Sequence, residues 1–121
     1  MKKWQRKVIL NELMPYMDEG ELKILDGVLS AIDGSFRGSV TEDFMLLEVS
    51  GSPREGELER LVEHLSRHFV SLSRDGGRRV FARAGDGFSV LVILEGSEVW
   101  VYVMTWDETV REALRDEESG H

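Results

Sequence analysis

The residues whose type and spacing could support chemistry most directly are two histidines, His64 and His68. They stand four positions apart in a segment with helical periodicity, so both imidazoles could reach one zinc ion. Leu65 stands where the HExxH motif has its glutamate, and a third ligand would have to come from elsewhere, such as His121. We therefore interpret the pair as surface or interface histidines, and we keep a histidine-ligated metalloenzyme as a minor alternative.

Other catalytic signatures are missing from the sequence. There is no cysteine, which excludes disulfides, thiol catalysis and cysteine-ligated zinc or iron–sulfur sites. No GxxxxGK[ST] or GxSxG motif occurs, and Gly85-Asp86-Gly87 fits a hairpin turn better than a phosphate-binding loop. We therefore expect no catalytic residue, no cofactor and no metal, and a protein that is not an enzyme.

The composition describes a soluble domain. Of the 121 residues, 41% are hydrophobic and 31% are charged, and the net charge is -8. Such an acidic surface repels phosphate backbones, so we expect no nucleic-acid partner. No apolar run approaches the roughly 20 residues of a spanning helix, and no signal-peptide pattern follows the basic residues 2–7. We therefore expect no membrane insertion and a cytoplasmic location.

Charge is distributed unevenly along the chain. Residues 18–59 carry eleven acids against three basic residues, whereas residues 60–83 carry six arginines against Glu63 and Asp75. Charged segments ordinarily form solvated faces, which is the simpler interpretation. The alternative is an arginine-rich patch that meets an acidic partner.

Hydrophobic periodicity predicts four helices and five strands. The strands at 88–94 and 98–106 are apolar on both parities, so we expect both faces of the sheet to be covered. Valines on one parity of 99–106 alternate with a layer of large side chains on the other. The predicted helices are 2–14, 20–33, 57–72 and 108–117, and the predicted strands are 36–41, 44–50, 79–84, 88–94 and 98–106.

The predicted fold class is therefore α+β, with a five-stranded antiparallel meander-type sheet covered by helices on both faces. The element order is α-α-β-β-α-β-β-β-α. The helix at 57–72 is expected on one face, and those at 20–33 and 108–117 on the other. The predicted organisation is an N-terminal helical appendage at 1–17, one domain at 18–117 and a disordered tail at 118–121.

Over residues 21–115 this order resembles the Roadblock/LC7 family of small-GTPase regulators. Residues 36–41 resemble the glycine-containing strand entry of that family, and 57–106 resemble its second helix and three-strand meander. The apolar and basic pattern of 110–115 is similar to that of its last helix. The first hairpin of the family usually turns at Asp-Gly, whereas this chain has Glu-Asp-Phe at 42–44.

The resemblance implies a non-catalytic homodimer that binds a small Ras-like GTPase, either as a scaffold or as an activator. It also implies that the sheets join across a two-fold axis and that the second helices pack together. The strand at 79–84 is expected to be an unpaired sheet edge that pairing with a second copy would close, although its arginines could equally protect that edge. The residues expected at the dimer or partner interface are His64, Arg67, His68, Arg79, Val80, Phe81, Ala82 and Arg83.

The main alternative is an acidic, dimeric secretion-type chaperone that binds unfolded effector segments. Three strands before the helix at 57–72 would favour the chaperone, whereas the sequence predicts two. If the second helices of the adaptor dimer pack together, His64 and His68 would lie near their interface. Protonation of these histidines near pH 6.5 would then loosen the dimer. Metal analysis of the purified protein distinguishes both adaptor and chaperone from the metalloenzyme.

Overall fold

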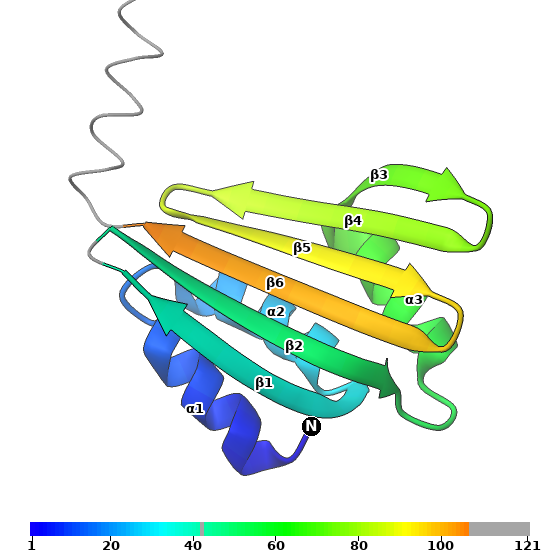
Figure 1. Cartoon of the computed structure of the whole chain (residues 1–121), viewed down its shortest axis with the longest axis horizontal. Helices are drawn as coiled ribbons and strands as arrows, with labels where there is room; N and C mark the ends of the chain where they lie inside the picture. Colours follow the sequence, from blue (N-terminus) through cyan, green and yellow to red (C-terminus); the bar gives the residue numbers. More distant parts are fainter. Residues whose placement is uncertain (42, 107–121) are drawn as a thin grey trace, which may run out of the picture.

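The computed structural model describes residues 1–41 and 43–106 of the chain. These residues form three helices and one antiparallel sheet with strand order β1-β2-β6-β5-β4-β3 (Figure 1). The helices are α1 (Lys3–Leu13), α2 (Glu19–Leu29) and α3 (Leu58–His68). The strands are β1 (Ile32–Val40), β2 (Phe44–Pro53), β3 (Val70–Asp75), β4 (Arg78–Gly85), β5 (Phe88–Glu95) and β6 (Glu98–Trp106). Each of these helices has 11 residues, short of the roughly 20 that crossing a bilayer needs.

The α+β class and the antiparallel sheet are confirmed, but the predicted number of strands is wrong, because the described residues form a 6-stranded sheet. We predicted a helix through residue 72, whereas α3 ends at His68 and β3 follows directly. Phe69 is already extended, with φ -120° and ψ 160°. Leu72, which belongs to the predicted helical stripe, is 60% exposed. The alternation of apolar residues and serines over 70–73 also fits a strand, and pairing with β4 selects that period.

The additional strand changes which strands lie at the edges of the sheet. β3 pairs with β4 over Val70–Asp75, so β4 lies between β3 and β5. The prediction that the strand at 79–84 is an unpaired edge is therefore wrong. The edges of the described sheet are β1 and β3. Pairing of β4 with a second copy would require β3 to leave the sheet first.

The buried residues of all three helices belong to one core on the same face of the sheet. In Figure 1 α2 and α3 lie behind the strands, and α1 runs along the β1 edge. The covered face carries Val99, Val101 and Val103 of β6, each at most 1% exposed. Leucines of α2 and α3 belong to the same buried core. The prediction that the helices at 20–33 and 57–72 lie on opposite faces is therefore wrong. Short β-branched side chains form an even layer, on which two helices can lie side by side.

The first helix contributes to this core. Ile9 and Leu13 of α1 are at most 1% exposed and belong to the same cluster of buried residues as α2 and α3. The segment 1–17 therefore packs on the domain through its own apolar side chains. The predicted helix at 108–117 and the predicted tail at 118–121 lie outside the described residues.

Two glycines allow β1 and β2 to approach each other closely. The helical period predicts Gly34 as the C′ glycine of the second helix, but it lies in β1 opposite Gly51 of β2. A Cβ atom on Gly34 would come within 2.2 Å of the Ser50 carbonyl oxygen. One on Gly51 would come within 2.0 Å of the Asp33 carbonyl oxygen. Neither position has room for a side chain, so the two strands meet here through bare backbone.

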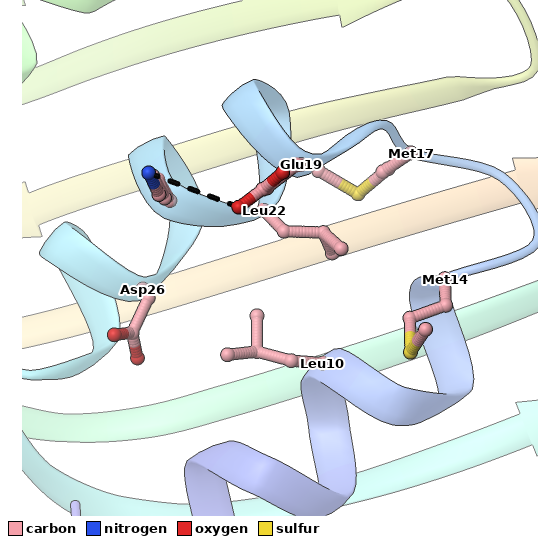
Figure 2. Close-up of a pocket in the computed structure, with 7 residues that line it drawn as sticks. Leu10, Met14, Met17, Glu19, Leu22 and Asp26 are labelled. Atoms are coloured by element: carbon pink, nitrogen blue, oxygen red, sulfur yellow. Dashed lines mark ion pairs between the residues drawn. The ribbon is translucent and has the colours of Figure 1, made fainter.

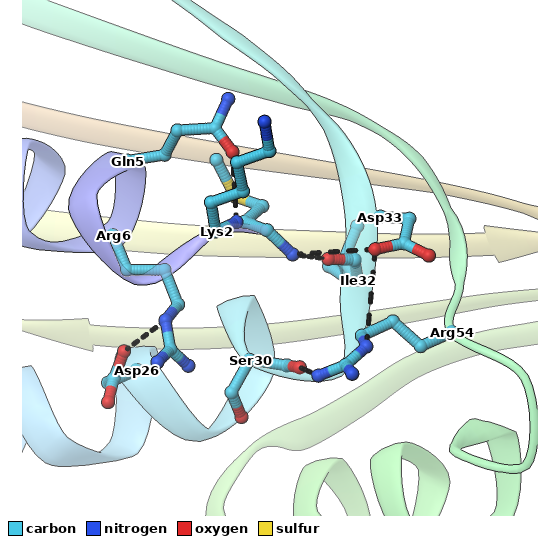
Figure 3. A network of polar contacts seen from close by, with 9 residues as sticks. Lys2, Gln5, Arg6, Asp26, Ser30, Ile32, Asp33 and Arg54 are labelled. Atoms are coloured by element: carbon cyan, nitrogen blue, oxygen red, sulfur yellow. Dashed lines mark hydrogen bonds and ion pairs between the residues drawn. The ribbon is translucent and has the colours of Figure 1, made fainter.

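Polar contacts join α1 to α2 and the start of β1 to the loop after β2 (Figure 3). Arg6 of α1 pairs with Asp26 of α2, with 3.6 Å between Nε and Oδ1. Arg54 donates from Nη1 to the carbonyl oxygen of Ser30 at 3.3 Å, and its Nε lies 4.0 Å from Oδ1 of Asp33. These contacts hold the end of α2 close to the two strands that follow it.

Arg83 of β4 connects the sheet to two helices. Its guanidinium donates to both carboxylate oxygens of Glu21, at 2.6 Å from Nε and 2.8 Å from Nη2. Its Nη1 donates to the carbonyl oxygen of His68, the last residue of α3, at 2.7 Å. One side chain thereby provides a hydrogen-bond donor for a carbonyl group at the C-terminal end of α3 and holds the first turn of α2 beside β4.

We expect Arg83→Met to lower the free energy of unfolding by about 2 kcal/mol, because Glu21 would remain partly buried without its partner. Urea unfolding followed by circular dichroism measures the change. Arg67→Met is the matched control, because Arg67 pairs with Glu63 on the exposed side of α3 and should contribute at most about 0.5 kcal/mol. Equal losses in the two variants would contradict this role of Arg83.

Candidate protein-binding surface

The eight residues predicted at an interface do not lie on one surface, because α3 supplies three of them and β4 supplies five. Alternation along β4 turns Val80 and Ala82 toward the sheet face without helices. Phe81 points toward the helices and is 4% exposed. The Arg83 guanidinium is occupied by Glu21. The structure therefore brings together only part of the predicted set.

His64 forms a contact between α3 and α2. Its Nε2 donates to the carbonyl oxygen of Ile24 at 2.8 Å, and because a carbonyl only accepts, Nε2 carries the proton. A Cβ atom on Gly27 would come within 2.6 Å of this same Nε2. The helical pattern alone gives no reason for a glycine in the middle of α2, whereas the structure shows that it makes room for the His64 ring.

His68 lies beside His64, with 4.8 Å between the ring centroids. Burial lowers the pKa of His68, and the neighbouring His64, Arg67 and Arg83 lower it further. In residues 1–41 and 43–106, no three His, Cys, Asp or Glu residues form a group that could hold a metal ion. His121, the third ligand considered for a zinc site, lies outside this range. The described contacts assign the two histidines to helix packing.

Several arginines of the segment 60–83 are paired with acids of the same chain. These ion pairs neutralise much of the positive charge that the sequence places in this segment. The pairs are Arg60 with Glu57, Arg67 with Glu63, and Arg83 with Glu21.

The sheet face opposite the helices is turned toward the viewer in Figure 1, and no helix of the described residues covers it. We name it the open sheet face. Trp100 lies beside Ile93 of β5, and Tyr102 lies beside Leu91. On β2, β6, β5 and β4 the apolar residues of the open sheet face are Phe44, Leu46, Val80, Ala82, Leu91, Ile93, Trp100, Tyr102, Met104 and Trp106.

The open sheet face remains accessible to solvent. Phe44 is 43% exposed and Met104 is 39% exposed, and the other apolar residues of the face are half-buried against one another. The separation of a valine layer from an aromatic layer on β6 was predictable from the alternation. We expected helices to cover both layers; α2 and α3 both cover the valine layer, and the predicted helix at 108–117 lies outside the described residues. Contiguous exposed apolar patches often mark the sites at which proteins bind other molecules.

Polar residues and shallow hollows border the open sheet face on its β1 side. Arg37 of β1 pairs with Glu48 of β2, and Glu48 lies beside Tyr102. A hollow of about 530 Å³ adjoins Trp100; its lining residues are Ser50, Gly51, Ser52, Ser97, Glu98 and Trp100. An apolar centre with a polar rim is the usual anatomy of a protein–protein interface.

An apolar depression lies between α1 and α2 (Figure 2). It has a volume of about 550 Å³. Leu10, Met14 and Leu22 line its apolar part, and Glu19 and Asp26 lie among its polar lining residues. Methionine side chains adapt readily to different apolar partners, so this groove could accept a flexible apolar segment.

We expect Gly27→Ala to disturb the contact between α2 and α3, although alanine is favoured over glycine in a helix by about 1 kcal/mol. The added methyl group displaces the His64 ring from the Ile24 carbonyl. In a His64→Ala background the same change should be stabilising. Unfolding free energies of the four proteins should therefore show a coupling of about 1 kcal/mol or more, and additive effects would contradict the contact.

The lowered pKa of His68 predicts a pH dependence of stability. Below its ordinary value of 6.5 the unfolded chain binds more protons at this site than the folded protein. Stability should therefore rise as the pH increases through 6.5 and become constant about one pH unit above that value. His68→Gln should reduce this rise, as measured by urea unfolding at several pH values. Parallel curves for the two proteins would show that His68 does not contribute.

The chain was also compared with known proteins. No family model, no curated protein and no solved structure matches it. The resemblance to the Roadblock/LC7 family therefore stays a prediction from element order and pattern. The functional interpretation rests on the geometry of the open sheet face.

Proposed function

We propose that this protein is a non-catalytic, cytoplasmic adaptor that acts by binding other proteins through its open sheet face, with a small Ras-like GTPase as client. The observation that carries the proposal is the row of large apolar side chains that no described helix covers. Trp and Tyr, which contribute most binding energy in many interfaces, lie near the centre of this face as Trp100 and Tyr102.

The shape of the open sheet face favours a protein partner over a small molecule. Small ligands bind in concave pockets that enclose most of their surface. Here the apolar side chains stand on a sheet, and the hollow beside Trp100 is lined mainly by serine and glycine. His64 and Arg83 are also engaged within the fold, since His64 donates to the Ile24 carbonyl and Arg83 donates to Glu21.

The element order supports the choice of client. A helix, two strands, a helix and a meander follow one another as α2, β1, β2, α3, β4, β5 and β6, with β3 as an additional strand. The resemblance to Roadblock/LC7 proteins is based on a helix, two strands, a helix, three strands and a last helix. The described residues have four strands after α3, and the predicted last helix at 108–117 lies outside them. By that resemblance the adaptor would bind a Ras-like GTPase and would itself be a dimer.

A secretion-type chaperone is the second candidate. The methionine-lined groove between α1 and α2 favours it, because Met14 is 61% exposed at the edge of a depression that could hold an unfolded segment. The two strands before α3 favour the adaptor.

Capture from a lysate of the source cell tests the adaptor and its client. Immobilised full-length protein should retain a Ras-like GTPase in one nucleotide state only, when either GDP or a non-hydrolysable GTP analogue is added. Leu91→Glu places a charge in the middle of the open sheet face and should reduce retention by at least about tenfold. Val8→Glu, on the outer side of α1 where Val8 is 42% exposed, is the matched control and should retain the client.

Capture of an unfolded protein regardless of nucleotide would contradict the adaptor. If Met14→Glu then abolished that capture while Leu91→Glu did not, the groove would be the binding site and the chaperone would be favoured.

A further inference from the structure

We propose that the outer edge of β3 binds an extended segment of another protein, which adds one strand to the sheet and places a glutamate or aspartate side chain beside Arg79. The acidic side chain would lie on the side of the sheet that the helices cover, away from the open sheet face. The inference therefore goes beyond the proposed function. An adaptor with this second site would hold its client and an acidic segment of a further protein together.

β3 has an outer side with which no described strand pairs, because it is an edge of the described sheet (Figure 1). The other edge strand, β1, has α1 running along it. Backbone N–H and C=O groups on the outer side of an edge strand can pair with an added strand. Proline and charged residues commonly prevent such pairing, and residues 70–73 contain neither.

Two large apolar side chains are exposed on this edge strand. Val70 is 65% exposed and Leu72 is 60% exposed. Leu72 stands at the register shift between Ser71 and Ser73 and has no Cα partner on β4. Exposed apolar side chains on an edge strand favour contact with another chain, because burial removes their surface from water. A segment paired with β3 would place a side chain about 5 Å from Val70 and cover part of it.

A hollow of about 210 Å³ adjoins β3 on the side of the sheet that the helices cover. Ser71 stands opposite Phe81 in the register, so both residues face that side. The lining residues of the hollow are Ser66, Phe69, Ser71, Arg79 and Phe81, and none of them is an acid. Pockets that enclose whole small molecules are larger, at about 300–1,000 Å³. The hollow therefore fits one side chain of a protein better than a complete ligand.

Arg79 supplies the positive charge of this hollow. It is half-buried, and no acid among the described residues forms an ion pair with it. Its cross-strand neighbours in the register are Leu94 and Arg74, so neither adjacent strand supplies an acid at this position. Arg83, two turns of the alternation further along β4, is paired with Glu21. A half-buried guanidinium without an acid suits a carboxylate, to which it can donate two parallel hydrogen bonds.

The edge and the hollow are placed so that one extended segment can use both. Side chains of a strand alternate between the two faces of the sheet. A residue of the added strand opposite Ser71 would therefore project toward the hollow, where the hydroxyl groups of Ser66 and Ser71 are further donors. The residues before and after it would project toward the side of Val70. The expected partner is thus an extended segment in which acidic and apolar residues alternate.

Arg78 provides a matched control for Arg79. The two arginines are adjacent on β4, so they face opposite sides of the sheet. Asp75 and Glu95 stand opposite Arg78 in the register, whereas no acid stands opposite Arg79. Replacement of either arginine by glutamine removes the same charge from the protein. A difference between the two variants therefore reports the hollow and not the net charge.

Binding of a fluorescently labelled peptide of about ten residues, alternating valine and glutamate, tests the site in the full-length protein. Anisotropy should show half-saturation below about 1 mM protein. Arg79→Gln should weaken binding by at least about tenfold, because the hollow loses its charged donor. Arg78→Gln should change binding by less than about twofold. Circular dichroism verifies that both variants are folded.

Hydrogen exchange of the backbone amides locates the bound peptide. Amides of β3 should exchange more slowly in the complex, because an added strand accepts hydrogen bonds from its outer N–H groups. Amides of β1 should be unchanged. A peptide with lysine in place of every glutamate should bind at least about tenfold more weakly, because it cannot pair with Arg79.

Absence of binding at about 1 mM protein would overturn the inference. Equal losses in the two arginine variants, equal binding of the lysine peptide, or protection of β1 or the groove between α1 and α2 in place of β3 would do the same. Concentration-dependent protection of β3 without peptide would show that a second copy of the chain occupies the edge, which also contradicts the proposal. The experiment contains no GTPase, so its result is independent of the proposed client.

Discussion

The contact of Arg83 with Glu21 and with the end of α3 joins both helices to the same face of the sheet. α2 and α3 are separated in the chain by the β1–β2 hairpin and could in principle lie on different faces. The guanidinium on β4 reaches both of them from the covered face. His64 then joins the two helices directly through the Ile24 carbonyl. With both helices on one side, the other face has no cover among the described residues.

The two faces of β6 differ in burial because the helices cover only one of them. Val99 and Val101 are fully buried under the helices, whereas Trp100 and Tyr102 are half-buried by their neighbours alone. Apolar area removed from water contributes roughly 25 cal/mol per Å². Burial of this aromatic face by a partner would therefore stabilise the complex. The same division that buries the valine layer leaves the aromatic layer in contact with water.

Local signals were sufficient for much of this fold. A helix was predicted from residue 20, and α2 begins one residue earlier, where the side chain of Asp18 accepts the Glu21 backbone N–H at 2.8 Å. The hairpin of β5 and β6 was predicted from its apolar runs and its turn. Leu72 fits the helical spacing of the preceding apolar residues, and residues 70–73 also alternate between apolar residues and serines as a strand does. Only the pairing with β4 decides between the two structures. The contact of Arg83 with Glu21 spans 62 positions and leaves no local signal. The alternation of valines with large side chains on β6 predicts two layers, but it does not predict which layer the helices cover.

The paired glycines of the first hairpin constrain how this sequence can change over time. Because each one lies against the backbone of the other strand, neither can accept a side chain while the other strand stays in place. The clash caused by a side chain at Gly34 or Gly51 cannot be relieved by a change at the other glycine. Related sequences should therefore retain glycine at both positions. Two glycines seventeen positions apart, one after the second helix and one near the end of the second strand, are therefore a marker by which distant relatives could be recognised.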